Sequence, residues 1–279
     1  MIWKTRDRDI DLARHGLVMG VLNVTPDSFS DGGEYFSPER AVEHGLRLLG
    51  EGADVLDIGG ESTRPGSDAV SAEEEIRRVV PVVQALRVRT PALLSIDTSK
   101  ASVARAALNA GADIINDVTG LRGDPEMPGV AADSGAGVVL MHMQGTPRTM
   151  QQTPEYGDVL GEVGAFFRES LDRASARGID PIRIALDPGI GFGKTPAHNR
   201  RLILGLEAFA ALGRPIAIGV SRKSFLGWLA GSDEMERRAV PGLVLTALCR
   251  ERGARIFRVH EPKIHREALR ATEAMLEDV

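Results

Sequence analysis

Carboxylate, amide and cationic side chains follow nearly every short apolar run in this sequence, at the residue where the run ends. They are Asn23, Asp57, Asp97, Asn116, Asp117, His142, Asp187, Ser221, Arg222, Lys223, Arg258 and His260. Helix capping explains one such residue, because an Asp or Asn side chain accepts hydrogen bonds from free backbone N–H groups. Recurrence at run after run instead favours a shared site, because the carboxyl ends of barrel strands open onto one face.

Two kinds of chemistry are present among these residues and the loops beside them. One set can form hydrogen bonds to a flat heterocycle that carries amino, ring N–H and carbonyl groups. It consists of Asp97, Asn116, Asp187 and Lys223. Such a site rejects ligands that would leave its buried groups unpaired. Groups suited to an anion are Asn23, Thr63, Arg64, Arg258 and His260, since guanidinium forks bind phosphate oxygens in pairs. The pattern predicts a heterocycle that carries a phosphorylated tail.

Several of these positions have more than one interpretation. Asn23 can also offer its amide oxygen to a Mg²⁺ ion that takes most of its ligands from phosphate and water. Asp57 either reaches this metal and phosphate or holds a neighbouring loop, and the sequence favours neither. Arg222 is either a wall of the site or a surface charge, and His265 is predicted to be a surface residue.

Short apolar runs alternate with longer amphipathic segments along the chain, which is typical of α/β proteins. The predicted strands are Leu17–Leu22, Val55–Ile58, Leu93–Ile96, Ile114–Ile115, Gly137–Met141, Ile184–Leu186, Ile216–Val220 and Arg255–Val259. The predicted helices are Pro38–Glu51, Ala72–Arg87, Ala101–Ala110, Glu126–Asp133, Tyr156–Ala176, His198–Ala211, Val240–Glu251 and His265–Asp278. Their number and the chain length predict one domain over residues 1–279, a (β/α)8 (TIM) barrel. A doubly wound open sheet is the alternative, because periodicity does not show closure.

Composition limits the kinds of partner. A net charge of −5 argues against a broad nucleic-acid surface, so a few placed cations must hold any anion. No apolar run approaches the roughly 20 residues of a membrane span. The charged first residues lack the apolar core of a signal peptide, which predicts a cytoplasmic protein. The apolar face of the last two helices predicts a homodimer.

Eight motifs, taken in order and spacing, resemble those of dihydropteroate synthases. They are "VMGVLNVTPDSFSDGG", "DIGGESTRPG", "SIDTSKASVARAAL", "GADIINDVTG", "VVLMHMQGTPRTMQ", "LDPGIGFGKT", "SRKSFLG" and "RVH". The resemblance runs from about Leu17 to His260. Enzymes of this family join a dihydropterin methyl-pyrophosphate to p-aminobenzoate and release pyrophosphate, with Mg²⁺ as cofactor. The resemblance therefore implies a folate-synthesis enzyme with these two small-molecule substrates.

The resemblance also implies roles for single residues. It places the pterin among Asp97, Asn116, Met141, Asp187, Phe192, Gly219 and Lys223. It places the pyrophosphate among Thr63, Arg64, Arg258 and His260, with Asn23 at the metal. It places p-aminobenzoate among Phe29, Pro65 and Ser224, under a loop that carries Asp31. The residues expected to carry the chemistry are Asp31, Lys223, Arg258 and His260.

One departure and two competing functions accompany this interpretation. After His260 the family usually continues Asp-Val, whereas this chain has Glu261-Pro262, where proline fixes φ and removes a donor. A pterin-dependent methyltransferase needs no aminobenzoate loop, and "SFSDGG" and "SRKSF" speak against it. An idle pterin-binding paralogue should have lost pyrophosphate or loop residues, and the sequence keeps them. The sequence therefore favours an active synthase.

Overall fold

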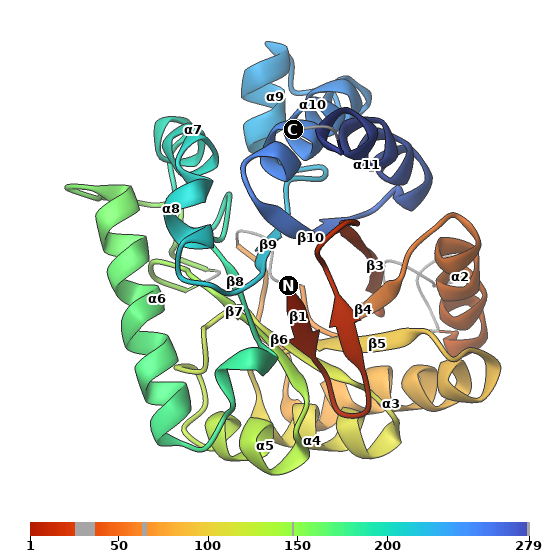
Figure 1. Ribbon diagram of the computed structural model, residues 1–279. Coiled ribbons are helices and arrows are strands. Elements are labelled where there is room, and N and C mark those ends of the chain that lie inside the picture. The colour runs from red at the N-terminus through yellow and green to blue at the C-terminus, as the bar shows by residue number, and fades with distance from the viewer. Residues whose placement is uncertain (26–36, 63–65, 147, 278–279) are drawn as a thin grey trace.

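The computed structural model describes residues 1–25, 37–62, 66–146 and 148–277. Its centre is a closed barrel of parallel strands in the order β10-β3-β4-β5-β6-β7-β8-β9 (Figure 1). The barrel strands are β3 (Leu17–Asn23), β4 (Val55–Gly59), β5 (Leu93–Asp97), β6 (Ile114–Asp117), β7 (Gly137–Met141), β8 (Ile184–Asp187), β9 (Ile216–Ile218) and β10 (Ala254–Val259). The chain is a (β/α)8 barrel, and closure through the β10–β3 pair rules out the open sheet.

Helices surround this barrel and cover the outer face of the strands (Figure 1). They are α2 (Pro38–Gly50), α3 (Ala72–Arg89), α4 (Ala101–Ala110), α5 (Met127–Ser134), α6 (Val159–Ala176), α7 (Pro196–Leu204), α8 (Leu206–Ala210), α9 (Ser224–Ala230), α10 (Ala239–Glu251) and α11 (Pro262–Leu276), with 3-10 turns η1 (Pro181–Arg183) and η2 (Glu236–Arg238). The predicted helix His198–Ala211 is wrong as one element, because Gly205 separates α7 from α8. Pro262 is the first residue of α11, where the missing N–H removes no helical hydrogen bond.

A hairpin that the sequence analysis missed closes the amino-terminal end of the barrel. Its strands β1 (Ile2–Lys4) and β2 (Asp9–Asp11) pair antiparallel. Trp3 is fully buried beneath the barrel, and its Nε1 donates to the carbonyl of Arg183 over 2.8 Å. Trp3 and Leu12 pack with the lowest apolar layer of the interior, which includes Met19 and Val55. The hairpin therefore seals one end of the barrel and leaves the carboxyl end for a site.

Inside the barrel, the side chains change from apolar to polar toward the carboxyl ends of the strands. Successive inward residues are two apart, because strand side chains alternate between faces. On β5 the inward Leu93 is followed by Ser95 and Asp97, and on β4 the inward Val55 is followed by Asp57. The two strands are in register, so Asp57 lies beside Ser95. This alternation puts the buried acids and amides at one mouth.

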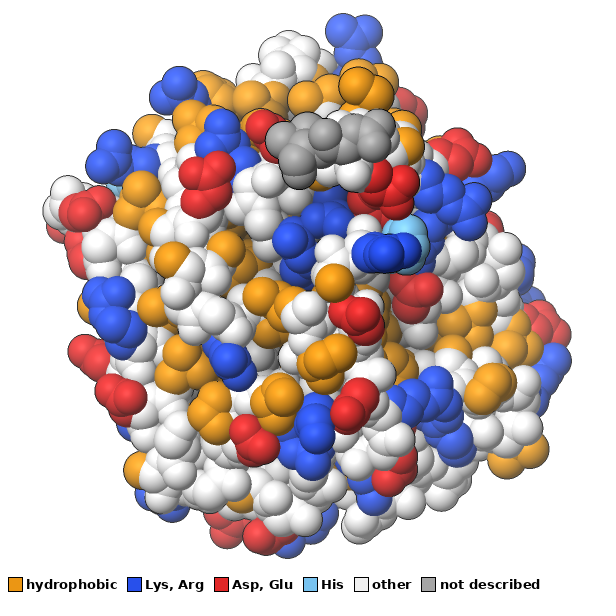
Figure 2. All heavy atoms as spheres, in the orientation of Figure 1, with side chains coloured by type: hydrophobic (Ala, Val, Ile, Leu, Met, Phe, Trp, Pro, Cys, Tyr) orange, Lys and Arg blue, Asp and Glu red, His pale blue; other side chains and the backbone are white. Residues whose placement is uncertain are grey.

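Surface charges of both signs are interspersed over the face drawn in Figure 2, which has the orientation of Figure 1. Acidic and basic side chains lie beside one another there, and neither sign forms one broad patch. Among the helices in the described part of the chain, none is long and apolar enough to cross a membrane.

Candidate active site

A pocket opens at the carboxyl end of the barrel. It is lined by Asp97, Asn116, Val118, Met141, Asp187, Gly189, Ile190, Phe192, Gly219, Lys223 and Arg258. All seven residues that the sequence analysis assigned to the pterin are among them. They come from strands and loops spread over more than 120 residues of sequence, and the barrel brings them together. The geometry therefore matches the predicted convergence, while the ligand itself stays a prediction.

Three buried acceptor residues, from β5, β6 and β8, line the pocket. Asp97, Asn116 and Asp187 are each between 5% and 7% exposed. Burial raises the pKa of Asp97 to about 7, although the Arg258 charge opposes the shift. Burial also raises the pKa of Asp187, whose Oδ1 accepts from the Gly189 N–H over 2.7 Å. Water is replaced here by protein, so these carboxylates are costly to ionise without a partner.

Arg258 of β10 lies across this pocket and bridges two carboxylates. Its Nε donates to Oδ2 of Asp57 over 2.6 Å, and its Nη2 donates to Oδ2 of Asp97 over 2.7 Å. The two carboxylates raise the pKa of Arg258 further, against the effect of burial. Arg258 therefore belongs to the wall that holds Asp97, in addition to the anion-binding role predicted for it.

Lys223, directly before α9, also lines this pocket. Its Nζ lies 3.9 Å from the centre of the Phe192 ring, within cation–π distance. Burial lowers the pKa of Lys223 to about 8, with Arg258 adding to the shift and the Asp187 and Asp97 charges opposing it. Lys223 lines the same pocket as the three acceptor residues, so the pocket offers both donors and acceptors to a ligand.

A buried lysine, Lys194, which was not predicted from the sequence, joins the loop after β7 to the loop after β8. Lys194 is 3% exposed, and its Nζ donates to the carbonyls of Phe192 over 2.9 Å and His142 over 3.3 Å. Its third contact is Nδ1 of His142 at 3.1 Å. Burial lowers the pKa of Lys194 to about 7 and that of His142 to about 3, so this imidazole is neutral. The position of Lys194 within "GIGFGKT", between a strand end and a helix start, was the one sequence signal for a role at this site.

The same two loops touch so closely that only glycine fits at two positions. A Cβ at Gly189 would lie 2.0 Å from the His142 carbonyl oxygen, and one at Gly193 would lie 2.6 Å from that of Gln144. Both glycines also have positive φ, which other residues rarely adopt. His142, which directly follows β7, is therefore a buried, hydrogen-bonded residue that packs against the Gly189–Lys194 loop without lining the pocket itself.

The remaining predicted residues divide between the rim and the undescribed loops. Asn23 ends β3, and Nδ1 of His260 lies 3.1 Å from the Ser221 hydroxyl at the ends of β10 and β9. Ser224 is the first residue of α9. Phe29, Asp31, Thr63, Arg64 and Pro65 lie outside the described residues, so their predicted roles stay predictions.

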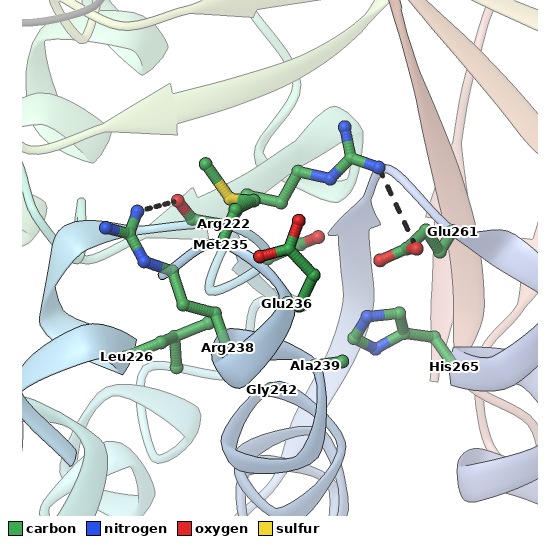
Figure 3. A pocket seen from close by; sticks show the side chains of 10 residues that line it. Arg222, Leu226, Met235, Glu236, Arg238, Ala239, Gly242, Glu261 and His265 are labelled. Atoms are coloured by element: carbon green, nitrogen blue, oxygen red, sulfur yellow. Dashed lines mark hydrogen bonds and ion pairs between the residues drawn. The ribbon is translucent and has the colours of Figure 1, made fainter. Parts of the chain in front are cut away.

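Arg222 lines a separate cavity of about 190 Å³ (Figure 3) and is not among the residues of the pocket above. Its Nη2 lies 3.8 Å from Oε1 of Glu261, and its side chain is 47% exposed. Arg238 donates to the Arg222 carbonyl over 3.2 Å and so holds the loop. Arg222 therefore does not line the pocket of Asp97 and Lys223, and its half-exposed side chain favours the surface charge of the two interpretations. His265, which lines the same cavity, is buried at 3% exposure and paired with the Thr246 hydroxyl, so its predicted surface position is wrong.

Comparison with known proteins agrees with this geometry. The model of the pterin binding enzyme family matches residues 19–260. Dihydropteroate synthase of Escherichia coli is 46% identical over 267 residues, which cover 96% of this chain and 94% of that protein.

Solved structures are equally similar. Xanthomonas albilineans dihydropteroate synthase with 4-aminobenzoic acid is 46% identical, with a TM-score of 0.92 and coverage of 99% of this chain and 98% of that chain. The same organism's enzyme in complex with 7,8-dihydropteroate has a TM-score of 0.89 at 42% identity, covering 99% of both chains. The chain belongs to the dihydropteroate synthase family of pterin binding enzymes.

Proposed function

We propose that this pocket binds 6-hydroxymethyl-7,8-dihydropterin pyrophosphate, and that the chain condenses it with p-aminobenzoate to give 7,8-dihydropteroate and pyrophosphate. One observation supports this most strongly. Oδ1 of Asp97 is buried in the pocket wall and has no hydrogen-bond partner among the described residues. A buried carboxylate oxygen without a partner is costly, and a ligand N–H would satisfy it. The amino and ring N–H groups of a pterin supply such donors.

The reaction needs little covalent help from the protein. The C–O bond to pyrophosphate breaks, a C–N bond to the aniline nitrogen forms, and that nitrogen then loses a proton. The pterin ring can carry the positive charge in between, which makes an SN1-like path. Asp97 and Asp187 would stabilise that charge, and cations aimed at the leaving pyrophosphate lower the barrier without reorganising. We assign the pyrophosphate to Arg258, His260, Thr63 and Arg64.

The other ligands are assigned to the rim. Ser224 at the start of α9, with Phe29, Asp31 and Pro65, is proposed to hold p-aminobenzoate. Asn23 ends β3 and offers one amide oxygen. Such an oxygen is a suitable ligand for a Mg²⁺ ion whose other ligands come mostly from pyrophosphate and water. When bound, Mg²⁺ neutralises charge on the pyrophosphate. No group of three or more His, Cys, Asp or Glu suited to a metal occurs among the described residues, which is consistent with a metal that arrives with its substrate.

The test is direct. The purified protein is incubated with Mg²⁺, the dihydropterin pyrophosphate and p-aminobenzoate, and both products are measured. Dihydropteroate and pyrophosphate in equal amounts are expected. Pterin binding without product would leave an idle paralogue, and methyl transfer without pyrophosphate release would identify a methyltransferase.

Pterin binding should strengthen as pH rises toward neutrality. Because the folded pKa of Asp97 is raised to about 7, the carboxyl is protonated below that pH and cannot accept from a second donor. We expect the affinity for 6-hydroxymethylpterin to rise by up to about tenfold per pH unit below pH 7 and then to level off. Calorimetry from pH 5.5 to 7.5 measures it. Asp97→Asn should give a shallower slope, and an equal slope would contradict the assignment.

We also propose a cytoplasmic homodimer that uses the last two helices. Val240 and Val244 lie four residues apart on α10 and are 69% and 60% exposed, and Met275 of α11 is 79% exposed. Trp228 of the neighbouring α9 extends this apolar surface at 55% exposure. Val240→Glu with Val244→Glu is expected to convert a dimer into a monomer in sedimentation velocity. Val88→Glu, at a still more exposed position on α3, should leave the dimer intact.

A further inference from the structure

Asp57 is a fully buried carboxylate to which the proposed function assigns no role. It is 0% exposed and lies inside the barrel on β4, beside Ser95. Two residues of the pterin pocket, Asn116 and Arg258, are bonded to it. Its interior position and these two bonds favour a role in holding neighbours over the alternative of a metal or phosphate ligand.

Both neighbours donate to the same oxygen. Oδ2 of Asp57 accepts from Arg258 Nε over 2.6 Å and from Asn116 Nδ2 over 3.1 Å. A carboxylate is an acceptor only, so the Asn116 amide must turn its NH₂ group toward it. The amide oxygen is then the atom left for the pocket that Asn116 lines. A flipped amide would place its oxygen against the carboxylate, and two acceptors would face each other without a proton.

We propose that Asp57 is a specificity-determining positioning residue, which fixes the orientation of the Asn116 amide so that the pocket offers oxygen acceptors to the heterocycle. With Asn116 fixed, the deep wall consists of acceptor oxygens from Asp97, Asn116 and Asp187. Such a wall favours a ligand whose ring edge carries hydrogen-bond donors. It disfavours a ligand with a carbonyl at that edge, because the carbonyl oxygen and the protein oxygen are both acceptors and neither can pair. This inference rests on the proposed function, since it takes the ligand to be a pterin.

The experiment compares two ring systems on one protein. The probes are 6-hydroxymethylpterin and 6-hydroxymethyllumazine, in which a 2-oxo group replaces the 2-amino group and N1 carries a hydrogen. Calorimetry gives the ratio of the two affinities for each variant. The ratio does not depend on the fraction of folded protein, so it separates a specificity role from loss of stability.

Two substitutions of Asp57 are expected to differ. Asp57→Leu removes the acceptor and frees the amide to flip, so the preference for pterin should fall at least about tenfold, the equivalent of one net hydrogen bond. Asp57→Asn can keep an oxygen at the Oδ2 position and should keep most of the preference. Ser95→Ala changes a residue beside Asp57 and should leave the ratio unchanged.

The outcomes are distinct. Wild-type protein that binds no pterin would remove the proposed function. Pterin binding with an equal loss of both affinities in Asp57→Leu, and hence an unchanged ratio, would overturn the inference alone. Asn116→Leu is the second variant if Asp57→Leu does not fold. It should also lose the preference, and a retained preference there would overturn the inference.

Discussion

Arg258→Met is expected to lower the free energy of unfolding by about 3–5 kcal/mol at pH 8, because it leaves two buried carboxylates without their cation. Asp57 is fully buried, and the side chain of Asp97 is 6% exposed. The Arg258 charge opposes the effect of burial on Asp97, so without it the pKa of Asp97 in the folded protein rises still further above that of the unfolded chain. Stability is then lost as pH increases, so the loss should be smaller at pH 5 than at pH 8. Urea titration at both pH values measures it.

The matched control for Arg258 neutralises the partners. In Arg258→Met with Asp57→Asn, one unpaired charge is removed, and part of the lost stability should return. Arg258→Lys keeps the charge but cannot bond to both carboxylates through two nitrogens, so it should fall between the wild type and Arg258→Met. A loss for Arg258→Met that is independent of pH, with no recovery in the double variant, would show that the ion pairs are not its cause.

Lys223→Met is expected to lower kcat/KM by about 10²–10³-fold through loss of preorganised electrostatic stabilisation. The ammonium lies 3.9 Å from the centre of the Phe192 ring, and the charges of Asp187 and Asp97 act on it. The pyrophosphate-release assay gives kcat and the KM for each substrate. The KM for the pterin substrate should rise more than the KM for p-aminobenzoate, because Lys223 lines the pterin pocket.

In contrast to Arg258→Met, the substitution Lys223→Met is not expected to lower the stability of the folded protein. Burial lowers the pKa of Lys223 to about 8, so the folded state penalises the ammonium. The penalty is fully present below pH 8 and is relieved as pH rises toward the unfolded pKa near 10.5. The variant should therefore melt at the same temperature as the wild type or higher at pH 7. Lower stability together with lower activity would mean that Lys223 is chiefly a structural residue.

The strand ends were the most predictable part of this protein. A buried parallel strand reads as an apolar run, and a polar residue at its carboxyl end marks the mouth of the barrel, so Asp97, Asn116 and Asp187 could be predicted from the sequence. Which of these residues lie close together depends on the closed barrel. Closure comes from long-range pairing of β10 with β3, which no local pattern encodes.

Other features lacked a local signal. The β1–β2 hairpin is short and rich in charge, and only Trp3 and Leu12 show that it packs on the core. His265 lies on a helix of mixed composition, and its burial depends on the Thr246 hydroxyl of another helix. Lys194 and Asp57 are buried charges whose partners come from distant strands and loops. Tertiary contacts decide such positions, and spacing along the chain does not show them.

The hairpin gives the molecule one of two built-in optical reporters, which lie at separate places. The chain has two tryptophans, Trp3 sealed beneath the barrel and Trp228 exposed on α9, five residues after Lys223. An aqueous quencher such as iodide reaches the second indole and not the first while the protein is folded. Trp228→Phe therefore leaves an emission signal that follows unfolding alone, and Trp3→Phe leaves one that follows the surroundings of α9.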